Sequence, residues 1–306
     1  MSEGLGWIVF IIFVVIMLAL DLGVFHRQSH VVKIKEALLW SVGWVILALI
    51  FNIGVYFFAG HEKALNFFTG YLIERALSLD NIFVFILIFN YFQVPPLYQY
   101  RVLFWGIVGA VVIRGIFIAA GIALIERFHF VVYILGVFLV WTGFKLFVEK
   151  DKKVEPEKNP VLKIFRKFMP VTNEYTQGHF FVKRSGQQWA TPLFITLIVV
   201  ATTDVVFAVD SIPAILAITT DMFIVYSSNI FAILGLRALY FVLAGMMEIF
   251  HFLNYGLAAI LIFVGVKMLL ADIYKIPIGI ALDVIVAILG TSMLVSVLTK
   301  KKKTKH

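Results

Sequence analysis

Long apolar segments recur along the whole chain and are separated mostly by short polar loops. Spanning a bilayer takes about 20 apolar residues in a helix, and nine segments satisfy this: 6–25, 37–59, 64–92, 101–126, 128–148, 190–220, 222–246, 249–271 and 277–298. The pattern predicts an all-α fold, a polytopic membrane helix bundle of about nine transmembrane helices. Because the first segment follows MSEGLG without a basic region or an evident cleavage site, we expect a retained helix rather than a signal peptide.

Composition supports the membrane assignment and removes several classes of chemistry. Hydrophobic residues make up 62% of the 306 residues and charged residues 14%, which leaves too little polar surface to cover a soluble fold. Cysteine is absent, so disulfides, thiolate metal sites and thiol catalysis are excluded. Phosphate-binding loops and the common protease motifs are also absent. We therefore expect a secondary transporter or channel in contact with lipid, and neither an enzyme nor a nucleic-acid-binding protein.

Basic residues in the loops predict the orientation of the chain. With nine spans, the loops on the same side as the C-terminus carry 18 Lys and Arg residues, and the opposite loops carry only Lys63, Arg127 and Lys275. Because cytoplasmic loops are enriched in Lys and Arg, we expect the N-terminus outside and the C-terminus in the cytoplasm.

Two regions of the chain repeat each other. The segment IERALSLDNIFVF (73–85) matches TTDVVFAVDSIPAI (202–215). A second match links ERFHFVVYI (126–134) to EIFHFLNYG (248–256). The polar pairs are Glu74 with Asp204, Asp80 with Asp210, Asn81 with Ser211, and Arg114 with Arg237. Since each copy holds three helices, the second copy must enter the membrane from the opposite side, which predicts an inverted repeat.

The repeat divides the chain into five predicted regions. A mixed-charge stretch between the copies is expected to be a solvated cytoplasmic loop, with a short amphipathic helix at the membrane surface. The regions are the first two helices at 1–63, repeat 1 at 64–148, the cytoplasmic loop at 149–189, repeat 2 at 190–271, and the last helix with a basic tail at 272–306.

The duplicated acidic motifs are the predicted functional site. Buried carboxylates in a span require a partner or a function, and a shared cation site near the midplane accounts for all of them. Oxygen ligands without Cys or His favour a hard divalent cation, and facing carboxylates offer proton antiport as the metal leaves. The predicted ligands are Glu74, Asp80, Asn81, Asp204, Asp210 and Ser211, supported by Ser78.

This site requires an interrupted helix. On a continuous helix, Asp80 lies roughly 120° from the face of Glu74, so we expect local unwinding, which Pro213 favours in the second copy. The alternative is structural: the acids neutralise Arg75, Arg114 and Arg237 in buried ion pairs. Both can hold together. Asp21, near the end of the first span, is equally consistent with a helix-end charge and with a supporting role.

The motif strings YLIERALSLDNIFVF and TTDVVFAVDSIPAI, followed by FAILGLRALYFVLAG and GVKML, closely resemble the TerC/Alx family, which is related to the lysine-exporter superfamily. The resemblance runs from about Asp21 to Pro277. It implies a bacterial inner-membrane protein, a link to manganese export, an association with tellurite resistance, and the six ligand residues above as the metal pathway. The chain departs from the family pattern at Ala201, where an acidic residue is common.

Three functions are therefore open from the sequence. The first is a secondary transporter that exports a divalent cation, foremost Mn²⁺, with the metal as substrate and no resident cofactor. The second is an exporter of an organic cation or amino acid. The third is a non-transporting partner in a metal or tellurite stress-response complex, in which the loop at 149–189 makes the contact. The oligomeric state does not follow from the sequence.

Overall fold

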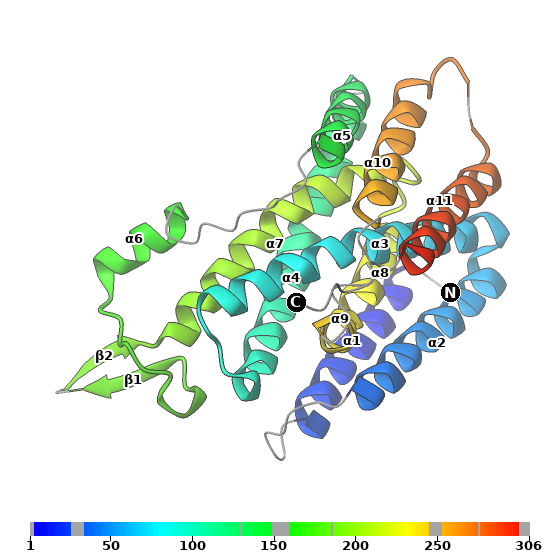
Figure 1. The fold of residues 1–306 in the computed structure, drawn as a ribbon. Helices are drawn as coiled ribbons and strands as arrows, with labels where there is room; N and C mark the ends of the chain where they lie inside the picture. The colour runs from blue at the N-terminus through cyan, green and yellow to red at the C-terminus, as the bar shows by residue number, and fades with distance from the viewer. Residues whose placement is uncertain are drawn as a thin grey trace.

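The computed structural model describes residues 3–25, 34–128, 130–148, 159–184, 186–244, 253–274 and 276–299. Helices dominate this part of the chain, and a short hairpin is added at one end (Figure 1). In order, the elements are α1 (Glu3–Phe25), α2 (Ile34–Ala59), α3 (His61–Tyr91), α4 (Pro96–Arg127), α5 (Val131–Val148), α6 (Pro160–Phe168), η2 (Thr176–Gly178), β1 (Phe181–Arg184), β2 (Gln187–Ala190), α7 (Pro192–Leu216), α8 (Met222–Leu234), α9 (Leu236–Ala244), α10 (Leu253–Leu269) and α11 (Ile278–Leu298).

The helices have the lengths and composition of membrane spans. Within the described residues, six are long and apolar enough to cross a bilayer: α2, α4, α5, α7, α8 with α9, and α11 up to Ser296. Two shorter apolar stretches lie in α1 (Gly4–Leu20) and α10 (Tyr255–Leu269). Each of the nine apolar segments overlaps a helix, and the segment 222–246 overlaps the pair α8 and α9. The number of crossings, nine, stays a prediction.

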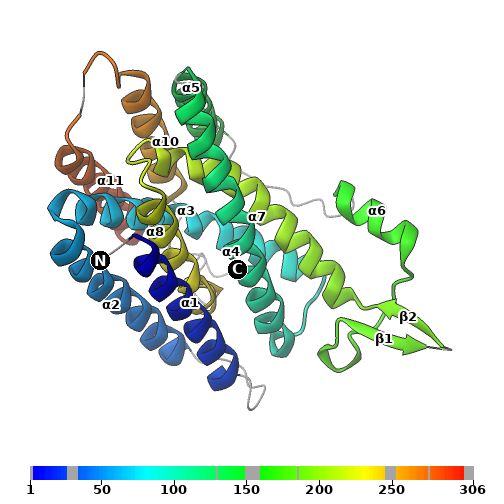
Figure 2. The same ribbon diagram turned by 180° about the vertical axis from the view of Figure 1, so that it is seen from behind.

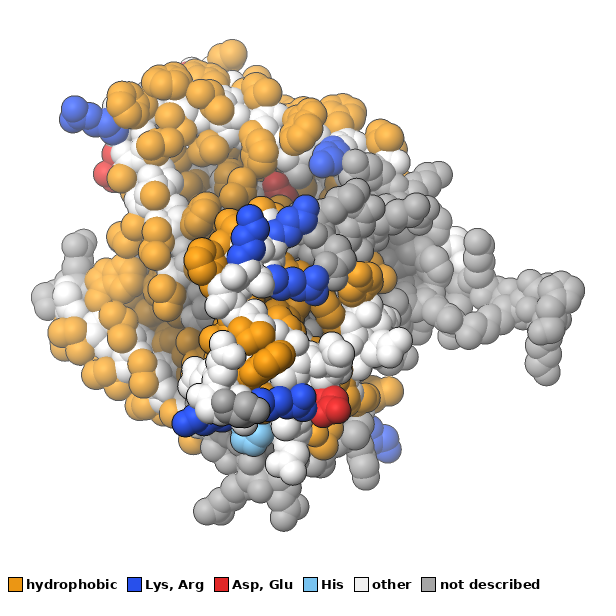
Figure 3. Space-filling model, turned by 90° about the vertical axis from the view of Figure 1, so that its left-hand side faces the viewer, with side chains coloured by type: hydrophobic (Ala, Val, Ile, Leu, Met, Phe, Trp, Pro, Cys, Tyr) orange, Lys and Arg blue, Asp and Glu red, His pale blue; other side chains and the backbone are white. Residues whose placement is uncertain are grey.

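Large apolar side chains cover much of the outer surface. Phe57 and Phe58 of α2 are 75% and 82% exposed, and similar residues point outward from α1, α4, α5 and α11. Figure 3 shows apolar side chains over much of the face that it displays, with Lys and Arg gathered on part of it. Such a surface is stable in lipid and would associate in water.

The packing of the two predicted repeats is reciprocal. Helix α3 packs against α8, α4 packs against α7, and α5 packs against α10. The first helix of each copy therefore contacts the second helix of the other, and the two third helices contact each other. Figures 1 and 2 show α5 beside α10 from opposite sides. A two-fold axis between inverted copies produces this crossed packing, which is therefore consistent with the predicted repeat.

Glycines bring α5 and α10 into backbone contact at two equivalent points. A Cβ atom at Gly143 would lie 2.8 Å from the carbonyl oxygen of Ala258, and one at Gly265 would lie 2.8 Å from that of Gly136. Gly143 and Gly265 are matching positions of the repeat, and so are Gly136 and Ala258. Small residues let membrane helices approach this closely and gain van der Waals contact.

The segment between the repeats is more structured than a solvated linker. Asn159 caps α6 by accepting hydrogen bonds from the backbone N–H groups of Val161 and Leu162, and Pro160 occupies the first turn. The predicted amphipathic helix is thus present, with Leu162 buried and Phe168 84% exposed.

A two-stranded antiparallel hairpin, β1–β2, follows α6 and was not predicted by the all-α assignment. Its strands are short and its turn includes Gly186, whose φ of 83° suits a tight hairpin. Upstream of the hairpin, the Tyr175 hydroxyl donates to the carbonyl oxygen of Phe92 at the end of α3. Burial raises the pKa of Tyr175 above the ordinary value of a phenol.

The expected interruption of α3 and α7 is wrong. Helix α3 is continuous over His61–Tyr91, and α7 is continuous over Pro192–Leu216 with Pro213 inside it. Pro213 lies in the last turn of α7, where it removes one backbone N–H donor without ending the helix before Leu216. The break lies instead between α8 and α9, at Gly235, in a stretch that the sequence predicted as one span.

Candidate functional site

A buried ion pair between Glu74 of α3 and Arg114 of α4 forms the centre of the candidate site. Glu74 is 0% exposed and Arg114 is 1% exposed. The Nη1 atom of Arg114 donates to Oε1 of Glu74. Taking two charges out of water is costly, and their close contact offsets that cost. The pair therefore links α3 to α4 through their side chains.

The second repeat contributes Asp204 and Ser211, both from α7. The Nη2 atom of Arg114 lies 3.4 Å from Oδ1 of Asp204, and its Nη1 atom lies 3.1 Å from Oγ of Ser211. Glu74 and Asp204 are matching positions of the two copies. One guanidinium thus joins the equivalent carboxylates of both repeats.

Asn229 of α8 completes this cluster and was missed by sequence reasoning. Its side chain is fully buried, donates from Nδ2 to Oε2 of Glu74 at 3.0 Å, and accepts at Oδ1 from Arg114 at 3.3 Å. The available signal was a run of three polar residues, Ser227 to Asn229, inside an apolar span. Asn229 has no polar counterpart in the first copy, so the repeated polar pairs do not include it.

Two oxygen atoms near this cluster have no hydrogen-bond partner among the described residues. They are Oδ2 of Asp204 and Oγ of Ser78, and both are buried. A buried polar atom without a partner costs free energy. These oxygens are therefore available to a ligand, in contrast to both carboxylate oxygens of Glu74, which accept hydrogen bonds.

The other predicted residues lie elsewhere in the chain, including positions on α3, α7 and α9. Asn81 of α3 is 3% exposed, Arg237 of α9 is 4% exposed, and Asp210 of α7 is partly exposed. The side chains of Asp80 and Asp21 lie outside the described part of the chain. Of the six predicted ligands, the structure brings Glu74, Asp204 and Ser211 together around Arg114.

The described side chains do not form a resident metal centre. Across the described ranges, no group of three Asp, Glu, His or Cys side chains is close enough to hold a metal ion. Two carboxylates meet at the site and share one guanidinium, so the cation there is part of the protein.

The hydrogen bonds of Arg75 differ from the expectation that a buried acid neutralises this residue. Its Nη1 donates to the carbonyl oxygen of Ala232 at 3.0 Å, and its Nη2 donates to Oγ of Ser41 at 3.2 Å. The break at Gly235 leaves carbonyl groups at the end of α8 without helical partners, and Arg75 satisfies one of them. Its guanidinium fills the space beside Gly235.

Comparison with known proteins identifies the family. The model of the integral membrane protein TerC family matches residues 59–304. The chain belongs to the TerC family. This confirms the resemblance seen in the acidic motifs, and the match includes both copies of the repeat.

Relatives of this TerC-family chain match it over nearly their whole lengths. It is 52% identical over 300 residues to an uncharacterized membrane protein of Myxococcus xanthus, covering 98% of this chain and 94% of that protein. It is 45% identical over 308 residues to the Alx protein of Salmonella typhi, covering 98% and 96%, whose name describes a candidate membrane-bound redox modulator. A membrane protein of Rickettsia bellii is 43% identical over 296 residues, covering 97% and 98%. No solved structure matches the chain.

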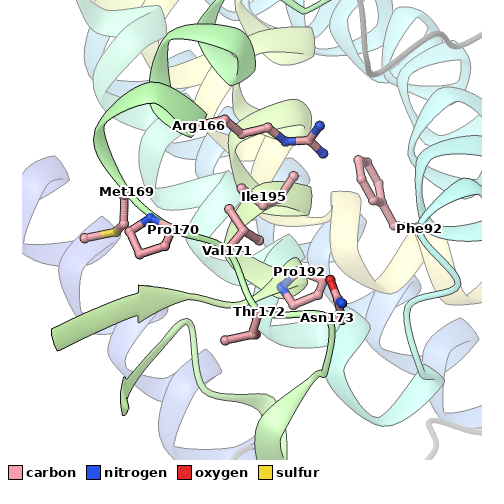
Figure 4. Close-up of a pocket in the computed structure, with 9 residues that line it drawn as sticks. All are labelled: Phe92, Arg166, Met169, Pro170, Val171, Thr172, Asn173, Pro192 and Ile195. Atoms are coloured by element: carbon pink, nitrogen blue, oxygen red, sulfur yellow. The ribbon is translucent and has the colours of Figure 1, made fainter. Parts of the chain in front are cut away.

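A cavity elsewhere in this TerC-family fold is separate from the acidic site. It has a volume of about 560 Å³ and lies between α6, the end of α3 and the start of α7. Figure 4 shows Arg166 and Phe92 on facing sides of it. Its lining consists of Phe92, Arg166, Met169, Pro170, Val171, Thr172, Asn173, Pro192 and Ile195. None of the predicted ligands is among them.

Proposed function

We propose that this protein is a secondary transporter that exports a divalent metal cation, foremost Mn²⁺, through the site around Glu74 and Asp204. The observation that carries the proposal is the meeting of these two equivalent carboxylates, one from each repeat, at a single buried positive charge. A place between inverted repeats that already binds a cationic side chain suits a transported cation.

The chemistry of the available atoms favours a hard cation. Carboxylate, amide and hydroxyl oxygens surround the site, and the chain contains no cysteine. Oxygen ligands of this kind suit Mn²⁺, Mg²⁺ and Ca²⁺ and are poor ligands for Cu⁺. Asp204 offers Oδ2 to the ion without breaking a protein hydrogen bond.

Proton antiport follows from the same carboxylates. When the metal leaves, two buried carboxylates face one guanidinium, which leaves one negative charge uncompensated among the described side chains. Uptake of a proton removes that charge. The cycle then exchanges the metal for protons and needs no nucleotide, in agreement with the absence of a phosphate-binding loop.

Uptake of radioactive Mn²⁺ by everted membrane vesicles tests the proposal. We expect uptake with the wild-type chain and less than a tenth of it with Glu74→Gln or Asp204→Asn, because each variant removes one charge from the pair. Glu62→Gln is the matched control, since Glu62 is an exposed carboxylate in the first turn of α3. Uptake that is equal in Glu74→Gln and in the wild type would refute the site.

A competition experiment with lysine distinguishes a divalent cation from the alternative substrate, an organic cation. Excess lysine should leave Mn²⁺ uptake unchanged if the substrate is a divalent cation. Inhibition by lysine, combined with lysine uptake that Glu74→Gln abolishes, would assign the same site to an organic cation instead.

A further inference from the structure

The two buried arginines, Arg114 and Arg237, occupy matching positions of the repeat. Arg114 contacts Glu74 of its own repeat and Asp204 of the other. Arg237 is equally buried, at 4% exposure, and lies at the start of α9. Since Glu74 and Asp204 are themselves equivalent, the contacts of Arg114 define a second, symmetry-related set of contacts for Arg237.

The distance of each residue from the loop that connects the two helices of its repeat is compatible with that second set. At 1.5 Å per residue, Glu74 lies about 26 Å before the end of α3, and Arg114 lies about 27 Å after the start of α4. In the second repeat, Asp204 lies about 18 Å before the end of α7, and Arg237 about 22 Å after the start of α8. Each arginine therefore lies at the same distance from the connecting loop as the carboxylate of its own repeat, to within about one helical turn.

The fold also provides a point at which Arg237 can move. Gly235 interrupts the helix two residues before Arg237, so α9 is a separate short helix. Arg75 binds the carbonyl of Ala232 and stabilises the broken backbone. The corresponding helix of the first repeat, α4, runs unbroken over Pro96–Arg127, so Arg114 moves only with its whole helix.

We propose that Arg237 is the second counter-ion of the same two carboxylates, and that Arg114 and Arg237 exchange on Glu74 and Asp204 when the transporter changes the side to which it opens. This rests on the proposed function and on the inverted repeat. In the present structure the carboxylates are held by Arg114. In the symmetry-related state Arg237 holds them and Arg114 withdraws.

The exchange has a physical reason. Two buried carboxylates without a cation are strongly destabilised, so a site that releases its metal inside the membrane needs a replacement charge at once. An arginine from each repeat provides it on both sides of the cycle. One arginine then compensates the carboxylates before the metal enters, and the other compensates them after the metal leaves.

The test uses the absence of cysteine. Ser78→Cys and Ala208→Cys place single reporters at matching positions of α3 and α7, both buried in the wild type. Their reaction with a membrane-impermeant maleimide is compared in right-side-out spheroplasts and everted vesicles. The ratio of the two rates measures to which side the protein opens.

Removal of one arginine should favour the state in which the other holds the carboxylates. We expect Arg114→Gln and Arg237→Gln to shift the labelling ratio about tenfold in opposite directions, because each variant removes a charge-assisted contact from one state only. The double variant should return toward the wild-type ratio. Arg114→Lys, which keeps the charge, should shift it less than Arg114→Gln and in the same direction.

Shifts in the same direction, or unchanged ratios in variants that elute as a single species in detergent, would overturn the exchange. A structural role alone would make both arginine variants less stable without giving shifts of opposite sign. Failure of the proposed function is distinguishable, since Mn²⁺ uptake is measured separately. Opposite shifts without uptake would leave the exchange standing for another substrate, whereas uptake without opposite shifts would refute the exchange alone.

Discussion

The glycine contacts between α5 and α10 can be tested by adding a single methyl group. In Gly143→Ala, the new Cβ would lie 2.8 Å from the carbonyl oxygen of Ala258 and 3.1 Å from the backbone nitrogen of Ile262. In Gly265→Ala, it would lie 2.8 Å from the carbonyl oxygen of Gly136 and 2.9 Å from the backbone nitrogen of Val140. Backbone atoms cannot rotate away, so the two helices must separate.

The expected loss follows from the size of this separation. Restoring an ordinary carbon–oxygen contact requires about 0.5 Å, and a gap of that size forfeits about a quarter of the dispersion energy of the contacts it opens. Overpacking of this kind costs about 1–3 kcal/mol, and alanine recovers up to about 1 kcal/mol through its higher helix propensity. We therefore expect each variant to lower the free energy of unfolding by about 1–2 kcal/mol, or roughly 5- to 30-fold in the unfolding equilibrium.

Reversible unfolding in mixed detergent and sodium dodecyl sulfate micelles measures this loss. Gly109→Ala is the control, since a Cβ at Gly109 of α4 meets nothing within 4 Å. The control should be as stable as the wild type or slightly more so. The double variant of Gly143 and Gly265 should lose less than the sum of the single losses, because one separation relieves both contacts. If Gly143→Ala and Gly109→Ala were equally stable, the close approach of α5 to α10 would be refuted.

Three further predictions concern polar contacts. Asn229→Ala should reduce Mn²⁺ uptake at least fivefold, because it removes a hydrogen bond to Glu74 and one to Arg114; uptake at the wild-type rate would contradict this. Asn159→Ala removes both the cap of α6 and a 2.6 Å hydrogen bond to Oγ1 of Thr202, so trypsin should cut α6 several-fold faster, and an unchanged cleavage rate would argue against the cap. Lys63→Ala should change the free energy of unfolding by less than about 1 kcal/mol, because its ion pair with Asp221 is partly exposed, and a larger loss would mean that the pair is more shielded than its exposure indicates.

The sequence predicted the positions of the helices well because apolar length is almost all that a membrane span requires. The structural alternative, in which the acids neutralise buried arginines, agrees with the contacts of Arg114 with Glu74 and Asp204, although the sequence did not indicate which acid meets which arginine. The family assignment was confirmed by the match over residues 59–304. The orientation, the inverted repeat and the transported metal stay predictions.

The errors have identifiable causes. The break at Gly235 is stabilised by Arg75 from another helix, a contact that no local pattern reveals. The unwinding expected at Pro213 rested on the backbone donor that proline lacks, but α7 continues through Pro213 to Leu216. The hairpin was not predicted because its strands are only four residues long, and each places two apolar residues beside two polar ones without alternation.

The pairing of α5 with α10 also sets an order of events during biosynthesis. Helix α5 ends at Val148 and α10 begins at Leu253, so about a hundred residues are translated before α5 can meet its partner. At about 5–20 residues per second, α5 remains in the bilayer for roughly 5–20 s with its glycine face against lipid. Neither half of the chain can complete its packing alone. A nascent chain that stalls between the two repeats would therefore expose inserted but unpaired helices to the quality-control proteases of the cell.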